Sequence, residues 1–219
     1  MTTTTQETVK CAVCGRKSSQ DILCSTNTFG APDLDTRPAE MQRATILNWV
    51  QECPTCGYCA GDISQAGKKA GKTVKEIRYQ QQLKHPGYPK LANRFLCHAF
   101  IALAEDEPKH AVWCYIHAAW ACDDAKNSEK AMECRNMASD HIIELTNHGK
   151  EVINQPGGTA ILLVDLLRRA ERFPEALYYA QQHVDDTEDL IAAIFRLQMT
   201  LIEKQDTDCH TVDELDDCE

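Results

Sequence analysis

Six of the twelve cysteines lie within residues 11–61, and four of these six form two matching motifs. The segments CAVCG (11–15) and CPTCG (53–57) each place two cysteines three positions apart, with glycine directly after the second. This spacing lets both thiolates meet one ion at tetrahedral angles, and the glycine permits a left-handed turn that frees backbone N–H groups to donate to sulfur. Two such knuckles predict one closed, structural Zn²⁺ site per chain. Its ligands are expected to be Cys11, Cys14, Cys53 and Cys56.

Redox chemistry is the main alternative for these cysteines. A thioredoxin-like Cys-x-x-Cys sits at the start of a helix inside a βαβ unit, and this chain has two copies and no βαβ pattern. Cys24 and Cys59 fit neither knuckle, so we expect spare thiols near the site. Oxidation of either thiol with release of zinc would make the protein a redox or metal sensor, and this alternative stays open.

A second set of metal-capable residues lies further along the chain. His110, Cys114 and His117 follow one another at i, i+4 and i+7, which places them on one helix face. Because Ala111, Trp113 and other apolar residues share this region, the three are expected to belong to the core or to a groove. The sequence has no phosphate-binding glycine loop, nucleophile elbow or convincing acid/base pair. A non-enzymatic protein is therefore expected.

The rest of the chain is predicted to be mainly α, because glycine and proline are sparse (10 and 8 residues) and 43% of the residues are hydrophobic. Two short helices are expected in residues 62–84, broken near Gly71. Ser128 is a good N-cap for one of the longer helices. The longer helices are expected near 90–104, 108–122, 128–147, 159–171, 174–184 and 187–203.

Two helix pairs resemble each other. In LAEDEPKHAVWCYIHAAW and RRAERFPEALYYAQQHV an apolar helix meets a short charged turn with proline, and the next helix buries an alanine first. These alanines, Ala111 and Ala176, lie 65 residues apart, about twice the roughly 34-residue period of tetratricopeptide repeats. A tetratricopeptide-like repeat body is predicted, with a plain antiparallel bundle as the alternative. Repeat helices form a concave groove that typically binds a protein segment.

Charge and composition divide the chain into four regions. Residues 1–10 are expected to be a disordered lead-in, 11–61 a zinc-ribbon-like module, 62–203 the helical repeat domain and 204–219 a mobile acidic tail. The net charge of -10 argues against a general nucleic-acid binder. Residues 68–94 nevertheless form a basic stripe, which could face RNA or DNA, pair with the acidic body or tail, or be a solvated helix face.

The compartment is expected to be the cytoplasm. The start of the chain, MTTTTQETVK, has no apolar segment typical of a secretion signal. The longest apolar runs, such as GTAILLVDLL, are about half the length that a membrane span needs. A reducing compartment is the one in which many cysteines stay free or bind metal.

Residues 9–63 resemble uncharacterised prokaryotic proteins grouped as domain of unknown function 2225. The resemblance rests on CAVCG and on TFGAPDLDTRPAEMQRATILNWVQECPTCGY (28–58). In that family a Cys-Pro-x-Cys-Gly knuckle is followed by a polar stretch and by an aromatic-rich strand that leads into Cys-Pro-x-Cys-Gly-Tyr. Helices similar to tetratricopeptide repeats come next.

The resemblance implies metal pairs on the same four cysteines, with Pro54, Gly57 and Tyr58 matching the second knuckle. This chain departs from the family at two positions. Ala12 stands where proline is usual, and Cys59 stands where a small apolar residue is common. The family has no established activity, so the resemblance implies fold and metal without implying a reaction.

Taken together, the sequence predicts a cytoplasmic, non-enzymatic zinc-binding adaptor. Its partner is expected to be a protein segment in the helical groove. The first alternative is a nucleic-acid-associated zinc-ribbon factor that uses the basic stripe, and its binding would depend on salt. The second alternative is the thiol or metal redox sensor.

Overall fold

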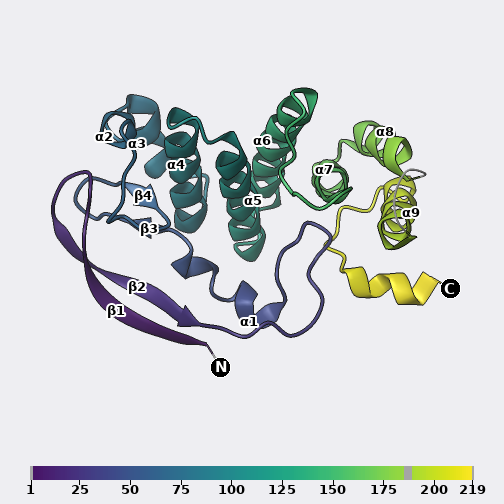
Figure 1. The fold of residues 1–219 in the computed structure, drawn as a ribbon, viewed down its shortest axis with the longest axis horizontal. Helices are drawn as coiled ribbons and strands as arrows, with labels where there is room; N and C mark the ends of the chain where they lie inside the picture. The colour runs from purple at the N-terminus through teal and green to yellow at the C-terminus, as the bar shows by residue number, and fades with distance from the viewer. Residues whose placement is uncertain (1, 185–188, 219) are drawn as a thin grey trace. The chain divides into compact units, whose positions relative to one another are not determined.

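The computed structural model describes residues 2–184 and 189–218, and it is mainly helical with two small antiparallel strand pairs in its N-terminal part (Figure 1). The strands are β1 (Thr3–Lys10), β2 (Lys17–Ser25), β3 (Gln51–Glu52) and β4 (Cys59–Ala60). The helices are α1 (Glu40–Arg43), α2 (Ala70–Thr73), α3 (Ile77–Leu83), α4 (Lys90–Ala104), α5 (Pro108–Asp124), α6 (Ser128–Asn147), α7 (Gly158–Arg169), α8 (Phe173–His183) and α9 (Asp189–Glu203), with 3₁₀ turns at Ile46–Asn48 and Val212–Cys218. Across the described ranges, no helix is both long and apolar enough to cross a membrane.

The six predicted long helices are confirmed, and their described ends differ from the expected ones by only a few residues. The expected start of the last helix at residue 187 lies outside the described residues. Local signals explain this agreement. Pro108 and Pro174 stand in the first turns of α5 and α8, where a missing N–H breaks no helical bond. The break between the two short helices α2 and α3 lies at 74–76, not at Gly71, which α2 includes.

Contacts divide the chain into two compact units. The first comprises Met1–Thr28 and Glu40–Cys134, and the second comprises Phe29–Ala39 and Arg135–Glu219. This grouping differs from the expected boundaries near residues 61 and 203. The segment Phe29–Ala39 leaves the cysteine-rich region and belongs with helices more than a hundred residues away, which no local sequence pattern reveals.

In the first unit, β1 and β2 form a long antiparallel hairpin with Thr8 opposite Ser19 and Lys10 opposite Lys17. The expected disordered lead-in over residues 1–10 is thus not observed at Thr3–Lys10. The physical reason is that TTTTQETV is rich in β-branched residues, which favour a strand once a partner strand is available. That partner, β2, follows the first cysteine knuckle, so a turn brings the two strands together.

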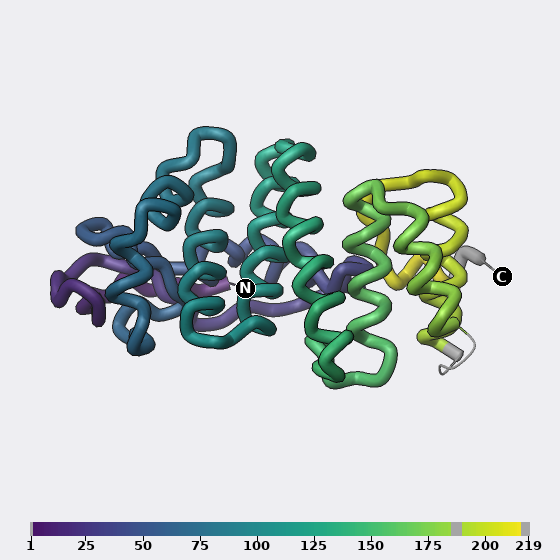
Figure 2. Tube along the Cα trace, turned by 90° about the horizontal axis from the view of Figure 1, so that it is seen from above, coloured from purple at the N-terminus to yellow at the C-terminus, as the bar shows by residue number. Residues whose placement is uncertain are grey.

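Helices α4 and α5 form the centre of the first unit and lie side by side, as Figures 1 and 2 show. Their shared interface buries Phe95, Ile116 and Trp120, each at most 2% exposed. Burying side chains of this size stabilises a fold by about 1.5–3 kcal/mol each. This packing fixes the relative register of α4 and α5, and that register positions the side chains described below.

One turn geometry recurs where helices end. The second residue after α4, α5 and α7 has a positive φ: Asp106 (67°), Lys126 (57°) and Glu171 (61°). In each case the next backbone N–H donates to a carbonyl five residues earlier: Glu107 to Ala102, Asn127 to Cys122 and Arg172 to Leu167, all at 2.9 Å. This is the bond pattern of the Schellman motif, which satisfies helix-terminal carbonyls.

Two positions in the helices that follow these turns concern burial and capping. The alanines predicted to be buried first in α5 and α8, Ala111 and Ala176, are both fully buried. The N-cap of α6 is Asn127, whose Oδ1 accepts the Lys130 N–H at 3.3 Å, and not Ser128 as expected. Asn127 also donates to the Gly87 carbonyl at 2.9 Å, so tertiary contact selects it as the cap.

The second unit is built from α7, α8 and α9, which bury Leu162, Leu166 and Phe195 completely. The segment Phe29–Ala39 joins it through an isolated bridge between Asp33 and Thr211 and through the Leu34 N–H, which donates to the His210 carbonyl at 2.9 Å. The expected mobile acidic tail is therefore ordered where this bridge lies.

Two arginines at the end of α7 hold this arrangement together. Arg168, fully buried, donates to Asp165 at 2.7 Å and to the carbonyls of Asp206 and Asp208 at 2.6 and 2.9 Å. Arg169 pairs with the fully buried Asp35 at 2.8 Å. Buried charges are tolerated only when paired in this way, so these contacts tie residues 29–39 and 206–208 to α7.

Candidate metal centre

Each cysteine knuckle forms the turn of a strand hairpin, one between β1 and β2 and the other between β3 and β4. The two turns have the same hydrogen bonds. Gly15 N–H donates to the Cys11 carbonyl and Gly57 N–H to the Cys53 carbonyl, both at 2.8 Å. The φ values of the two glycines are 74° and 75°, a left-handed conformation that favours glycine. The sequence prediction of two equivalent knuckles is confirmed at this level.

The two knuckles face each other and bring four sulfur atoms together. Cys11 Sγ lies 3.8 Å from Cys56 Sγ, and Cys14 Sγ lies 3.6 Å from Cys53 Sγ. All four sulfurs lie within 4.8 Å of one another, so the group could hold one metal ion. The distances are far longer than the roughly 2.05 Å of a disulfide, and every cysteine whose side chain is described is a free thiol.

The thiols of this cluster do not share one pKa. For Cys53, burial raises the pKa, but the backbone N–H groups of Cys56 and Thr55 outweigh burial and lower the pKa to about 7. For Cys56, burial raises the pKa and neighbouring thiols raise it further. Burial likewise raises the pKa of Cys11. Of these three thiols Cys53 loses its proton most easily, and a bound cation would favour the thiolate form of the others.

Contacts outside the cluster fix the second knuckle on the helices of the first unit. Tyr79 of α3 is fully buried; its hydroxyl donates to the Gly57 carbonyl at 2.9 Å and accepts the Cys59 N–H at 3.0 Å. Arg94 of α4 pairs with Glu52 of β3 at 2.7 Å. The knuckle therefore cannot move without disturbing α3 and α4.

The two cysteines outside the knuckles differ in environment. Cys59 is fully buried, and burial together with the neighbouring Cys97 raises its pKa well above the usual value. A buried thiol of this kind is a poor nucleophile, which argues against oxidation of Cys59. Cys24 lies exposed on β2, away from the hydrogen bonds that shape the knuckles.

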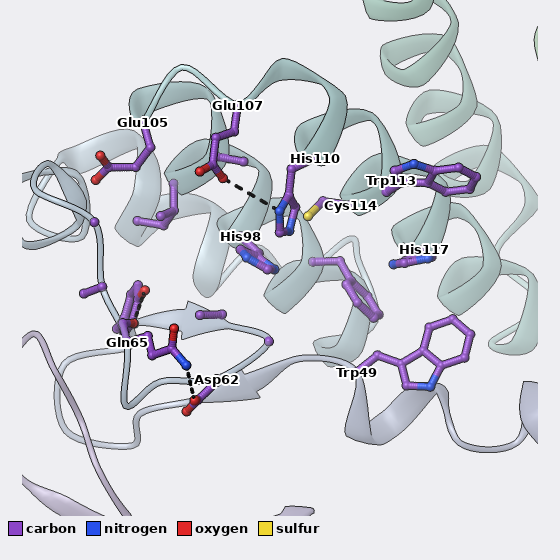
Figure 3. A pocket seen from close by; sticks show the side chains of 18 residues that line it. Trp49, Asp62, Gln65, His98, Glu105, Glu107, His110, Trp113, Cys114 and His117 are labelled. Atoms are coloured by element: carbon purple, nitrogen blue, oxygen red, sulfur yellow. Dashed lines mark hydrogen bonds and ion pairs between the residues drawn. The ribbon is translucent and has the colours of Figure 1, made fainter. Parts of the chain in front are cut away.

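A cavity of about 650 Å³ lies in the first unit, and its lining includes Tyr58, which follows the second knuckle directly. One wall is the stretch around Trp49 and 58–67, which the second knuckle holds in place, and the other wall comes from α4 and α5 (Figure 3). Its lining includes the aromatic side chains of Trp49, Phe95 and Trp113. It also includes three carboxylates and three imidazoles but no lysine or arginine: Asp62, Glu105, Glu107, His98, His110 and His117.

The structure separates the three metal-capable residues predicted on α5. His110 and Cys114 lie together with His98 of α4, and their ligand atoms are all within 4.8 Å of one another. His117 instead packs among aromatic rings, with centroid distances of 5.1 Å to Trp49 and 5.0 Å to Trp120, as a core or groove residue would. Figure 3 shows His117 apart from the His98 group.

Sequence reasoning missed His98, although a signal for it exists. Helices α4 and α5 are joined by a tight turn at Asp106, so residues equally far before and after Asp106 face each other across the antiparallel pair. His98 and Cys114 lie eight positions on either side of it. Counting back from Asp106 by the same number of residues that separate it from Cys114 leads to His98.

The basic stripe is mostly exposed. Its two arginines that pair with acids are Arg78, with Glu76 at 2.8 Å, and Arg94. The exposed lysines of the stripe are Lys68, Lys69, Lys72, Lys75, Lys84 and Lys90.

No protein-family model, curated protein or solved structure matches this chain.

Proposed function

We propose that this protein is a non-enzymatic adaptor in which a structural zinc ion holds one wall of a partner-binding cavity. The observation that carries the proposal is the composition of that cavity, whose walls come from the segment beside the Cys₄ group and from the helices α4 and α5. A cytoplasmic location, tetratricopeptide-like repeats in the helical body and membership of domain of unknown function 2225 belong to the same proposal. The recurrent helix-end turns and the buried Ala111 and Ala176 support the repeats.

The sulfur geometry fits a zinc ion. A Zn–S bond of about 2.3 Å in a tetrahedron puts the sulfurs about 3.8 Å apart. The sulfur distances of 3.8 Å for Cys11–Cys56 and 3.6 Å for Cys14–Cys53 lie close to that edge. Four thiolates leave no open position, so this ion would stabilise the fold and take no part in a reaction.

The partner that suits the cavity is a protein segment with a lysine or arginine side chain. Asp62, Glu105 and Glu107 supply negative charge, and Trp49 and Trp113 supply aromatic faces that attract cations. Glu105 is already held by the Lys69 N–H at 2.6 Å, which fixes its carboxylate at the rim. A cationic side chain between aromatic rings would be bound by both charge and stacking.

Metal analysis tests the structural part of the proposal. We expect one zinc ion per chain that four thiols protect from alkylation. Chelation should make residues 11–28 and 40–61 protease-sensitive while α7, α8 and α9 keep their helical content and amide protection. Iron in place of zinc, or a disulfide between the knuckles, would overturn the structural assignment.

Peptide selection tests the adaptor part. Random displayed peptides selected on the zinc-loaded full chain should converge on a lysine or arginine beside an apolar residue. A selected peptide should bind at least tenfold more weakly to the Trp113→Ala variant and equally well to the Tyr178→Ala variant, which alters an exposed aromatic residue of the second unit. Equal affinity for all three proteins would exclude the cavity as the binding site.

A nucleic-acid partner is the second candidate, favoured by the exposed lysines of the basic stripe. It predicts salt-dependent binding of a single-stranded RNA oligonucleotide. Replacing Lys68, Lys69, Lys72 and Lys75 by glutamine would abolish that binding and leave peptide affinity unchanged.

A further inference from the structure

We propose that His98, His110 and Cys114 form a second metal site, separate from the Cys₄ group, which binds a zinc-class divalent ion with one coordination position open to the cavity. This inference does not depend on the identity of the adaptor's partner. The three residues come from both helices of the central pair, His98 from α4 and the other two from consecutive turns of α5. Their donor atoms lie within 4.8 Å of one another, and all three residues line the cavity.

The helix pair preorganises these donors. His110 and Cys114 stand at i and i+4 and so project from the same face of α5. The rings of His98 and His110 meet edge to face with centroids 4.5 Å apart (Figure 3). Tetrahedral coordination needs donor atoms about 3.3–3.8 Å apart. The donor atoms lie within 4.8 Å of one another, so they must approach more closely to share one ion. Because His110 is exposed, rotation of its side chain can bring its ring nitrogen closer to the other two donors without moving α4 or α5.

The protonation states suit a metal ligand. Burial, and to a smaller extent the neighbouring imidazoles, lower the pKa of His98 to about 3, so the ring is neutral at physiological pH. The His110 ring lies beside the His98 ring. A neutral imidazole nitrogen beside a cavity is a common metal ligand.

Cys114 supplies the sulfur ligand. It is 2% exposed, and burial raises the pKa of its thiol, so without a cation it stays protonated. Binding of the ion would displace the thiol proton to solvent as the S–metal bond forms, which makes binding pH-dependent. Two imidazoles and one thiolate are a ligand set that suits zinc and leaves the fourth position for water or a cavity ligand.

A carboxylate supports the site from outside. Glu107 Oε2 lies 3.8 Å from His110 Nδ1, as the dashed line in Figure 3 marks. Carboxylates beside metal-binding histidines orient the ring and raise its basicity, and their loss typically weakens metal binding about 10- to 100-fold. Glu107 is thus a positioning residue rather than a ligand. Asp62 and Glu105 add negative charge to the same cavity.

Cobalt(II) titration of the full chain, with the Cys₄ group already filled with zinc, tests the site. We expect one further equivalent of cobalt to bind, with a single thiolate-to-cobalt charge-transfer band in the near ultraviolet and release of one proton. The His110→Gln variant should lose this equivalent, weakening binding about 100-fold or more, and Glu107→Gln should weaken it about 10- to 100-fold. Both changes lie at exposed positions, so folding is preserved.

Cys114→Ala should remove the charge-transfer band, whereas Cys122→Ala, which alters another buried thiol of α5, should not. The proposal is overturned if no cobalt binds beyond the zinc-filled group. It is also overturned if the extra cobalt binds equally well to His110→Gln and to Cys114→Ala. The zinc content of the Cys₄ group is measured separately, so failure of this site leaves the structural zinc untouched.

Discussion

Alanine at the glycine of each knuckle should have unequal effects, because the knuckles match in backbone but not in surroundings. Gly15 and Gly57 have φ values of 74° and 75°, so an alanine would carry the same backbone strain at either position. A Cβ on Gly57 would stand 2.3 Å from Leu83 Cδ2, closer than real atoms approach. A Cβ on Gly15 would have only Lys10 Cε within range, at 4.0 Å.

The expected loss of zinc affinity follows from the backbone strain at each glycine and from the clash with Leu83. A left-handed conformation costs an alanine about 1–2 kcal/mol, and this applies to both variants. Because Leu83 is half-buried and the contact is with a terminal methyl, its side chain can turn away, and the clash adds about 1 kcal/mol for Gly57→Ala alone. Because zinc binding and folding of the module are coupled, each 1.4 kcal/mol corresponds to about tenfold in apparent zinc affinity. Gly15→Ala should weaken zinc binding roughly 10-fold, and Gly57→Ala roughly 100-fold.

The assay is competition for zinc against a chromophoric chelator, with thermal unfolding measured on the same samples. A double-mutant cycle isolates the clash: in a Leu83→Ala background, adding Gly57→Ala should cost no more than Gly15→Ala does. Equal losses for the two single variants, or a Gly57→Ala cost that persists undiminished without the Leu83 side chain, would refute the steric reasoning.

Three further predictions concern the second unit and the helix caps. Arg168→Met should lower the free energy of unfolding by about 3–5 kcal/mol, because it leaves buried acceptors without their donor. Arg172→Met removes partly exposed ion pairs and should lower it by about 1 kcal/mol or less. Urea denaturation measures both values. Asn127→Ala should destabilise the protein by about 1 kcal/mol or more through its cap and its Gly87 contact, whereas Ser128→Ala should change its melting temperature little. Burial raises the pKa of Asp206, but a neighbouring backbone N–H and an imidazole outweigh burial and lower the pKa below its usual value. As the pH falls, this carboxylate is therefore protonated in the unfolded chain before it is protonated in the folded one, and the folded state loses stability. Amide protection of α9 should fall as the pH drops below about 4, and it should fall less steeply in Asp206→Asn.

Several features of this protein could be predicted because they are local. The Cys-x-x-Cys-Gly spacing determines a knuckle through bonds within five residues, and both copies adopt it. Proline positions and polar turns likewise mark the ends of α4 to α9, since a helix boundary depends on residues within one turn of it.

Other features depend on residues far apart in sequence, and no local pattern reveals them. The strand β1 exists because β2 pairs with it; the polar segment alone reads as disordered. Phe29–Ala39 belongs to the second unit because Arg169 pairs with Asp35, a contact across 134 positions. His98 joins His110 and Cys114 only through the register in which α4 packs on α5. The sequence by itself thus determined the knuckles and the helices. Tertiary packing decided which distant side chains come into contact, because those contacts depend on the summed burial of many side chains rather than on neighbours along the chain.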